Sequence, residues 1–138
     1  APALSYGDIE GLTLLGTNGW NSRNLIKRGA EYVEGAIFVD GFFNNSPYSI
    51  VRNFSSTFKS TIKKNPGIVE AHSYDTTEII INLLSQERIK TRGDLQNALL
   101  SIKDFPGVTG SISFSETGDA EKPLFILTVE NERIIQVN

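Results

Sequence analysis

Residues 11–41 read GLTLLGTNGWNSRNLIKRGAEYVEGAIFVDG, and this stretch decides the fold class. Residues 12–16 and 36–39 are short apolar runs between glycines, a pattern typical of strands buried on both faces of a parallel sheet. Between them, Asn21 or Ser22 can cap a short helix. The order strand, helix, strand predicts a βαβ unit, whose crossover is right-handed in nearly all proteins. We therefore expect an α/β fold.

Three helices are expected in the middle of the chain. Apolar residues recur at every fourth position along the face of the first, at Ile50, Phe54, Phe58 and Ile62. Pro66 and Gly67 end this helix, and a longer helix is expected over about 69–86, with its later half buried on all sides. A third helix starts near Thr91, and residues 104–107 break it.

The last third of the chain has the pattern of strands and turns. Residues 111–115 alternate between polar and apolar side chains, which is the period of a strand, and 116–119 are typical turn residues. Residues 124–129 and 134–137 then predict the two strands of a hairpin.

Composition excludes several classes of function. The chain has 138 residues, with 13 Lys and Arg against 16 Asp and Glu, so no basic surface for nucleic acid or anionic lipid is expected. It has no Cys and one His, which excludes cysteine nucleophiles and multi-histidine metal sites. No phosphate-binding or nucleophile-elbow motif is present. We expect a protein that is not an enzyme and that needs no metal or cofactor.

The single histidine, His72, lies three residues before Asp75 on the longer predicted helix. This spacing puts the two side chains on neighbouring positions of the helix surface. We expect a surface or capping pair rather than a catalytic couple.

The loop after the first predicted strand is the best candidate for a ligand site. Ligands of open α/β sheets bind at the carboxyl ends of strands, where this loop lies. Its candidate contacts are Thr17, Asn18 and Trp20. Asn18 can hydrogen-bond a ligand or shape the turn. Trp20 can form an apolar wall of a binding cleft or pack against its own loop.

Several strings, in this order along the chain, resemble a known family. They are GTNGW at 16–20, VEGAIFV at 33–39, Tyr74-Asp75 opening an apolar helix, and FPGVTGSISF at 105–114. Together they resemble the C-terminal part of type I periplasmic binding proteins, in the branched-chain amino-acid-binding group of ABC-transporter solute receptors. The strings GTNGWNS and FVDGFF also look similar to the lipoprotein branch that activates penicillin-binding peptidoglycan synthases.

The resemblance implies a fragment of a fold with two lobes, each a three-layer αβα sandwich, that close on a ligand about a hinge. Residues 1–44 would form a βαβ segment of the second lobe, 45–109 a helical segment of the first lobe, and 110–138 a return to the second lobe. Ala71 and Ser73 would approach the cleft from the first lobe.

The implied function is that of an extracytoplasmic solute receptor in the bacterial periplasm or cell envelope. It would bind a small amino-acid-like or other small polar ligand and deliver it to a membrane transporter. Relatives can carry an acidic residue at the position of Asn18. Because Asn18 is neutral, a neutral ligand is also an alternative. The alternative function is an envelope scaffold that regulates a peptidoglycan synthase through its surface.

The chain contains no Met and begins at Ala1, so we expect it to be a processed or truncated product. The resemblance implies that the central strands of the first lobe are missing. Apolar faces of the helices between residues 45 and 109 would then lack a sheet to pack on. We expect this fragment to self-associate through these faces.

Overall fold

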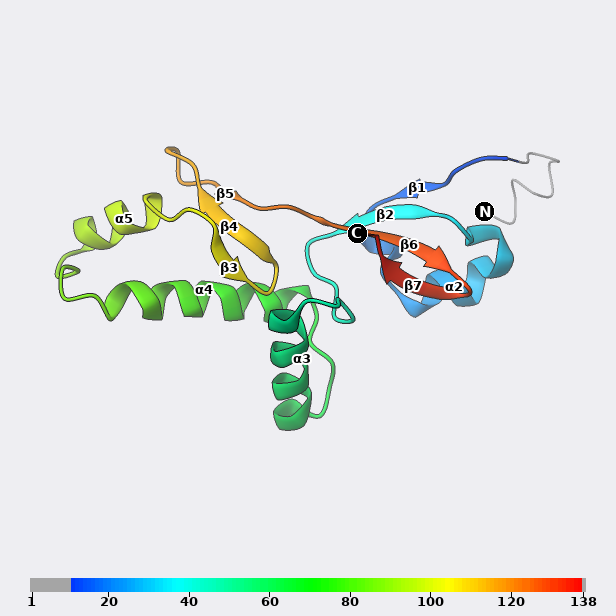
Figure 1. Ribbon diagram of the computed structural model, residues 1–138, viewed down its shortest axis with the longest axis horizontal. Coiled ribbons are helices and arrows are strands. Elements are labelled where there is room, and N and C mark those ends of the chain that lie inside the picture. Colours follow the sequence, from blue (N-terminus) through cyan, green and yellow to red (C-terminus); the bar gives the residue numbers. More distant parts are fainter. Residues whose placement is uncertain (1–10, 138) are drawn as a thin grey trace.

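The computed structural model describes residues 11–137, and it has a sheet at each end of an elongated chain (Figure 1). The helices are α2 (Arg23–Gly29), α3 (Ser49–Ile62), α4 (Ile68–Leu84) and α5 (Arg92–Leu100), with two short 3-10 helices, η1 (Asn18–Trp20) and η2 (Ala30–Val33). The strands are β1 (Leu15–Gly16), β2 (Ile37–Asp40), β3 (Phe105–Gly107), β4 (Gly110–Phe114), β5 (Ala120–Glu121), β6 (Phe125–Glu130) and β7 (Arg133–Gln136). The expected α/β class is confirmed.

The sheet at one end has the strand order β1-β2-β6-β7. Strands β1 and β2 run parallel, with Leu15 opposite Ile37, and α2 connects them, which confirms the predicted βαβ unit. Strand β6 pairs antiparallel with β2, with Phe125 opposite Asp40. Strand β2 pairs with β1 at Ile37 and Phe38 and with β6 from Ile37 to Asp40, so β6 holds its carboxyl end in place.

Strands β6 and β7 form the predicted hairpin, with Glu130 opposite Arg133. The two residues between them, Asn131 and Glu132, have φ angles of 51° and 56°. Positive φ at both positions is what a two-residue type I′ hairpin turn requires. The carboxylate of Glu34 accepts hydrogen bonds from the backbone N–H of Asn131 (3.1 Å) and of Glu132 (2.7 Å). These bonds stabilise a turn that lacks the glycine usual at such angles.

The two faces of this sheet differ in burial. Phe38 and Leu127 lie on the face that helix α2 covers and belong to the larger hydrophobic core. On the opposite face, Leu15 is 74% exposed. The expectation that residues 12–16 form a strand buried on both faces is therefore wrong. Only Leu15 and Gly16 pair, β1 is an edge strand, and no helix within residues 11–137 covers the face on which Leu15 lies.

At the other end of the chain, α4 and α5 pack on the antiparallel sheet β3-β4-β5 (Figure 1). The buried residues of this second core are Ile79, Leu83, Ala98 and Ile112. Residues 104–107 were expected only to break the third helix, but Phe105–Gly107 form β3, with Phe105 opposite Ile112. Pro106 is tolerated there because β3 is an edge strand, where a missing N–H costs no ladder bond.

Helix α4 is buried along one side only. Ile79 and Leu83 face α5 and the small sheet and are buried. Ile81 and Leu84, on the other side, are 59% and 57% exposed. The expectation that the later half of this helix is buried on all sides is therefore wrong, because nothing among the described residues packs against its second side.

Helix α3 crosses the beginning of α4 between the two sheets (Figure 1). The ring of Phe54 lies 6.0 Å from that of Phe42 and 4.8 Å from that of Tyr74, measured between centroids. Phe54 and Phe58 thus face the larger core, as the fourfold spacing predicts, whereas Ile50 and Ile62, towards the two ends of the helix, are exposed.

Two chain segments, 41–48 and 122–124, join the two ends of the molecule (Figure 1). The segment boundaries expected from the sequence, 1–44, 45–109 and 110–138, stay predictions, and residues 1–10 and 138 lie outside the described residues. Ile112, from the third of these segments, packs against the helices of the second.

Candidate functional site

A groove lies at the carboxyl ends of the two parallel strands, and we call it the β1–β2 groove. Its volume is about 700 Å³. Its walls come from the loops after β1 and β2, the first turn of α4, and β7, and they include Asn18, Asn21, Asp40, Ile68 and Arg133. Since parallel strands end at the same edge of a sheet, the two loops meet there, as at the ligand sites of open α/β sheets.

Asn18 lies at the start of η1 and lines the β1–β2 groove. Its side chain is exposed, and its backbone carbonyl accepts a hydrogen bond of 3.0 Å from the N–H of Asn21. Asn18 therefore shapes the turn through its backbone, while its side-chain amide is accessible from the groove. The two roles expected for Asn18 from the sequence, hydrogen-bonding a ligand and shaping the turn, are both compatible with this geometry.

Trp20 packs against its own loop and the sheet. Its ring centroid lies 6.3 Å from that of Phe38, edge to face, and it contributes to the larger core. A Cβ atom on Gly16 would lie 2.4 Å from the indole, so a glycine is required there. Thr17 is exposed, and its carbonyl accepts the N–H of Trp20 at 2.9 Å. The geometry of Trp20 favours the packing role over a wall of the groove.

Asp40, the last residue of β2, is a polar residue of the groove that the sequence reasoning missed. Its side chain is only 8% exposed. Its Oδ2 accepts a hydrogen bond of 2.8 Å from Nδ2 of Asn21, and its Oδ1 a longer one of 3.4 Å from the N–H of Phe42. The sequence carried a signal for this residue. Asp40 lies at the end of the second predicted strand, as the loop of Asn18 lies at the end of the first.

The two positions expected from the first lobe lie on α4 outside the lining of the groove. Ala71 is fully buried in the larger core. Ser73 is exposed, and its Oγ donates to the carbonyl of Val69 at 2.9 Å. The part of α4 that does line the groove is its first turn, at Gly67 and Ile68.

Asp75 is buried, so the expected surface pair of His72 and Asp75 is wrong for the carboxylate. Its Oδ1 accepts the N–H of Val108 at 2.7 Å, and its Oδ2 accepts the N–H and the hydroxyl of Thr109 at 2.9 and 2.6 Å. Lys122 Nζ donates to the same hydroxyl oxygen at 2.9 Å. This network ties α4 to the β3–β4 turn and to the segment that leads into β6.

His72 lies beside this network, with Nε2 3.3 Å from Lys122 Nζ. Burial lowers the pKa of His72 below its usual 6.5, and the charge of Lys122 lowers it further, while Asp75 opposes this. Burial also lowers the pKa of Lys122, again opposed by Asp75. The surroundings of His72 thus disfavour a positive charge on its ring next to the charge of Lys122.

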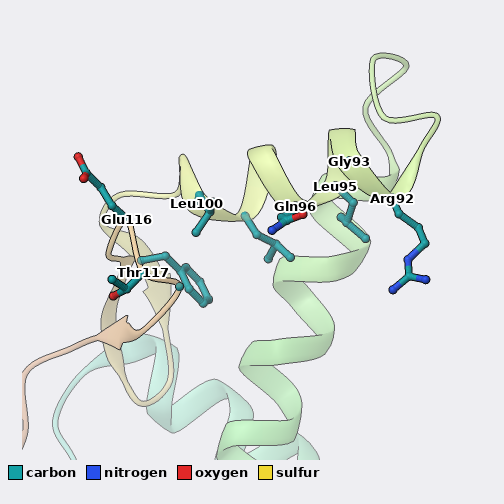
Figure 2. A pocket seen from close by; sticks show the side chains of 10 residues that line it. Arg92, Gly93, Leu95, Gln96, Leu100, Glu116 and Thr117 are labelled. Atoms are coloured by element: carbon teal, nitrogen blue, oxygen red, sulfur yellow. The ribbon is translucent and has the colours of Figure 1, made fainter.

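A second cavity, of about 720 Å³, lies between α5 and the β4–β5 turn. Leu95, Leu99, Leu100 and Phe114 form the apolar part of its lining, and its polar side chains are all exposed. Figure 2 shows Arg92 at one end of this row of side chains and Glu116 at the other. This cavity lies away from the ends of the parallel strands, and it holds no cluster of polar side chains comparable to Asn18, Asn21 and Asp40.

Within residues 11–137, no helix is long and apolar enough to cross a membrane, and no group of three acidic or histidine side chains is arranged to hold a metal ion.

Comparison with protein families gives one match that covers nearly the whole chain. Residues 6–133 match a family model described as periplasmic binding protein. No curated protein matches the chain by sequence.

Solved structures with the same fold are ABC-transporter receptors. A putative branched-chain amino acid ABC transporter protein of Rhodospirillum rubrum is 25% identical, with a TM-score of 0.88 over 96% of this chain and 39% of its own. A leucine-binding protein of Thermotoga maritima is 22% identical, with a TM-score of 0.69 over 99% of this chain and 39% of its own. A branched-chain amino acid substrate-binding protein of Streptococcus pneumoniae, solved with isoleucine, is 20% identical, with a TM-score of 0.65 over 98% and 40%. The chain thus spans about two fifths of these structures.

Proposed function

Because the chain belongs to the periplasmic binding protein family, we propose that it is part of an extracytoplasmic solute receptor that binds a small amino-acid-like ligand in the β1–β2 groove. In the whole receptor, closure of two lobes would enclose the ligand, and a membrane transporter would accept it. The role is binding and delivery, with no catalytic step.

The position of the groove is the observation that carries this proposal. The loops that follow two parallel strands meet there, and the first turn of α4 faces these loops across the groove. The segments 41–48 and 122–124 join the two ends, and residues 42–45 of the first segment line this groove. A change in the backbone angles of these segments would therefore open or close it.

The ligands of two related receptors support the ligand class. The Thermotoga maritima structure is described as leucine-binding, and the Streptococcus pneumoniae structure contains isoleucine. Both are less than 25% identical to this chain, so they support its fold, and the amino-acid-like ligand is our proposal. Among the sequence candidates, we propose Asn18 as a direct contact, with Thr17 and Trp20 shaping its loop, and Ala71 and Ser73 as more distant supports on α4.

We expect the chain to bind an aliphatic amino acid weakly. It spans about two fifths of the length of the related receptors, so it offers the ligand only the contacts of that part. Ligand-detected NMR with L-leucine, L-isoleucine and L-valine at millimolar concentrations measures this binding. Asn18→Ala removes one hydrogen-bonding group and is expected to weaken binding about two- to tenfold.

The matched control is Asn24→Ala, the same change at an exposed position of α2 that does not line the groove. It is expected to bind as the unaltered chain does. A synthase-regulating scaffold, the alternative from the sequence, gives the opposite outcome, with no binding of any of the three amino acids and no effect of Asn18→Ala.

We also propose that the chain self-associates through the exposed side of α4. Ile81 and Leu84 lie one helical turn apart there, and apolar patches of this kind favour association. Sedimentation velocity is expected to show dimers or larger species whose fraction rises with concentration, and Ile81→Gln with Leu84→Gln to shift the chain to monomer.

The comparison variant carries Leu15→Thr and Ile126→Thr, which make the open face of the large sheet polar. If it dissociates the oligomers and the α4 variant does not, the sheet face and not α4 is the contact. A chain that stays monomeric at all concentrations contradicts the proposal altogether.

A further inference from the structure

We propose that Asp40 makes the β1–β2 groove selective for ligands with a protonated amine, whose positive charge its carboxylate binds. This inference rests on the proposed function and adds to it the residue that selects the ligand. It moves the acidic contact from the loop after β1, where Asn18 is neutral, to the end of the neighbouring strand β2.

The first argument is the burial of Asp40 and the hydrogen bonds that it lacks. A carboxylate has about four acceptor positions. The side chain of Asp40 is 8% exposed, and it receives one bond of 2.8 Å from Asn21 and one long bond of 3.4 Å from the N–H of Phe42. The carboxylate of Asp40 therefore keeps unused acceptor positions. It lines the groove, and water reaches it poorly.

The second argument is charge. Removing a carboxylate from water is costly unless a cation or several hydrogen bonds compensate. Arg23 and Arg133 line the same groove, yet within the described part of the chain no lysine or arginine forms an ion pair with Asp40. Both of its hydrogen-bond partners are neutral. A ligand ammonium would supply the missing charge, through charge-assisted bonds about twice as strong as neutral ones.

The third argument is rigidity. Asp40 ends β2 and pairs with Phe125 of β6, while the pairing of β2 with β1 reaches only to Phe38. Asn21, at the C-terminal end of η1, holds its Oδ2. The carboxylate is therefore fixed beside the loop of Asn18 before a ligand arrives, so little conformational entropy is lost on binding.

The experiment uses three probes that share one carbon skeleton. L-leucine carries an amine and a carboxylate, 4-methylpentanoate carries only the carboxylate, and L-leucinamide carries only the amine. The unaltered chain is expected to bind leucine and leucinamide, and to bind 4-methylpentanoate at least about tenfold more weakly. This comparison needs no variant, so it holds even if a substitution at Asp40 impairs folding.

Asp40→Asn keeps the size of the side chain and removes its charge. It is expected to weaken leucine and leucinamide about tenfold and to leave 4-methylpentanoate unchanged or slightly tighter. The matched control is Glu31→Gln, which removes the same charge from an exposed side chain of η2 that does not line the groove. This control is expected to change none of the three affinities by more than about twofold, because an exposed charge is screened by water.

The outcomes separate the two proposals. If no probe binds the unaltered chain, the proposed function fails, and the role of Asp40 fails with it. If leucine binds, but 4-methylpentanoate binds equally well or Asp40→Asn binds leucine as before, only the role of Asp40 is overturned. Equal effects of Asp40→Asn and Glu31→Gln would also overturn it, because the effect would then come from net charge.

Discussion

Asp75→Ala is expected to lower the free energy of unfolding by about 3–5 kcal/mol. The buried carboxylate accepts three hydrogen bonds, from the N–H of Val108 and from the N–H and hydroxyl of Thr109. Without it these donors stay buried and lose their partner, and each unsatisfied donor costs about 1–3 kcal/mol. A Cβ on the neighbouring Gly107 would lie 2.7 Å from Oδ2 of Asp75, which shows how closely the turn packs on this side chain.

Urea denaturation followed by circular dichroism measures this loss. The control is Glu78→Ala, one turn further along α4, where the side chain is exposed. It is expected to change the stability by about 0.5 kcal/mol or less. Should Asp75→Ala prove as mild as this control, the network does not hold the β3–β4 turn to α4.

Phe38→Ala is the second large effect, at about 3–5 kcal/mol of lost stability. The side chain is 1% exposed at the centre of the larger core, and its removal leaves a cavity between the sheet and α2. Trp20, the only tryptophan, packs against Phe38 edge to face, so its fluorescence reports the same site. Denaturant unfolding followed by this fluorescence gives the stability directly.

The matched control is the next residue towards the N-terminus of β2. Ile37 is 39% exposed on the open face of the sheet, and Ile37→Ala is expected to cost about 1 kcal/mol or less. Similar losses for the two variants would mean that in solution the open face is covered, for example by a second copy of the chain.

Local patterns predicted much of the fold. The apolar runs bounded by glycines placed the strand, helix and strand of the βαβ unit. The alternation at 111–115 placed β4, and the runs at 124–129 and 134–137 placed the hairpin of β6 and β7. These elements depend on neighbours close in the chain. Strand β3 was missed because its three residues, Phe105–Gly107, have no periodicity of their own and become a strand only by pairing with β4.

Long-range contacts decided the burial of side chains, and the burial predicted from the sequence for residues 12–16 and for the later half of α4 was wrong. An apolar run is buried on both faces only if two layers cover it, and within the described residues no layer covers the face on which Leu15 lies. Likewise, Ile79 and Ile81 are two residues apart on α4 and identical in type, yet one is buried and the other exposed. The partner surface makes the difference between them.

The sequence by itself determined the order of the longer elements, the family resemblance and Asn18 as a groove residue, because each follows from short strings or from the rule that loops after parallel strands share one edge. Only the tertiary structure decided that the carboxylates of Asp40 and Asp75 are buried. The hydrogen-bond partners of both carboxylates are 19 or more positions away in the chain, with one exception at Phe42. The burial of a charge depends on which distant segments fold over it, and no local pattern carries that information.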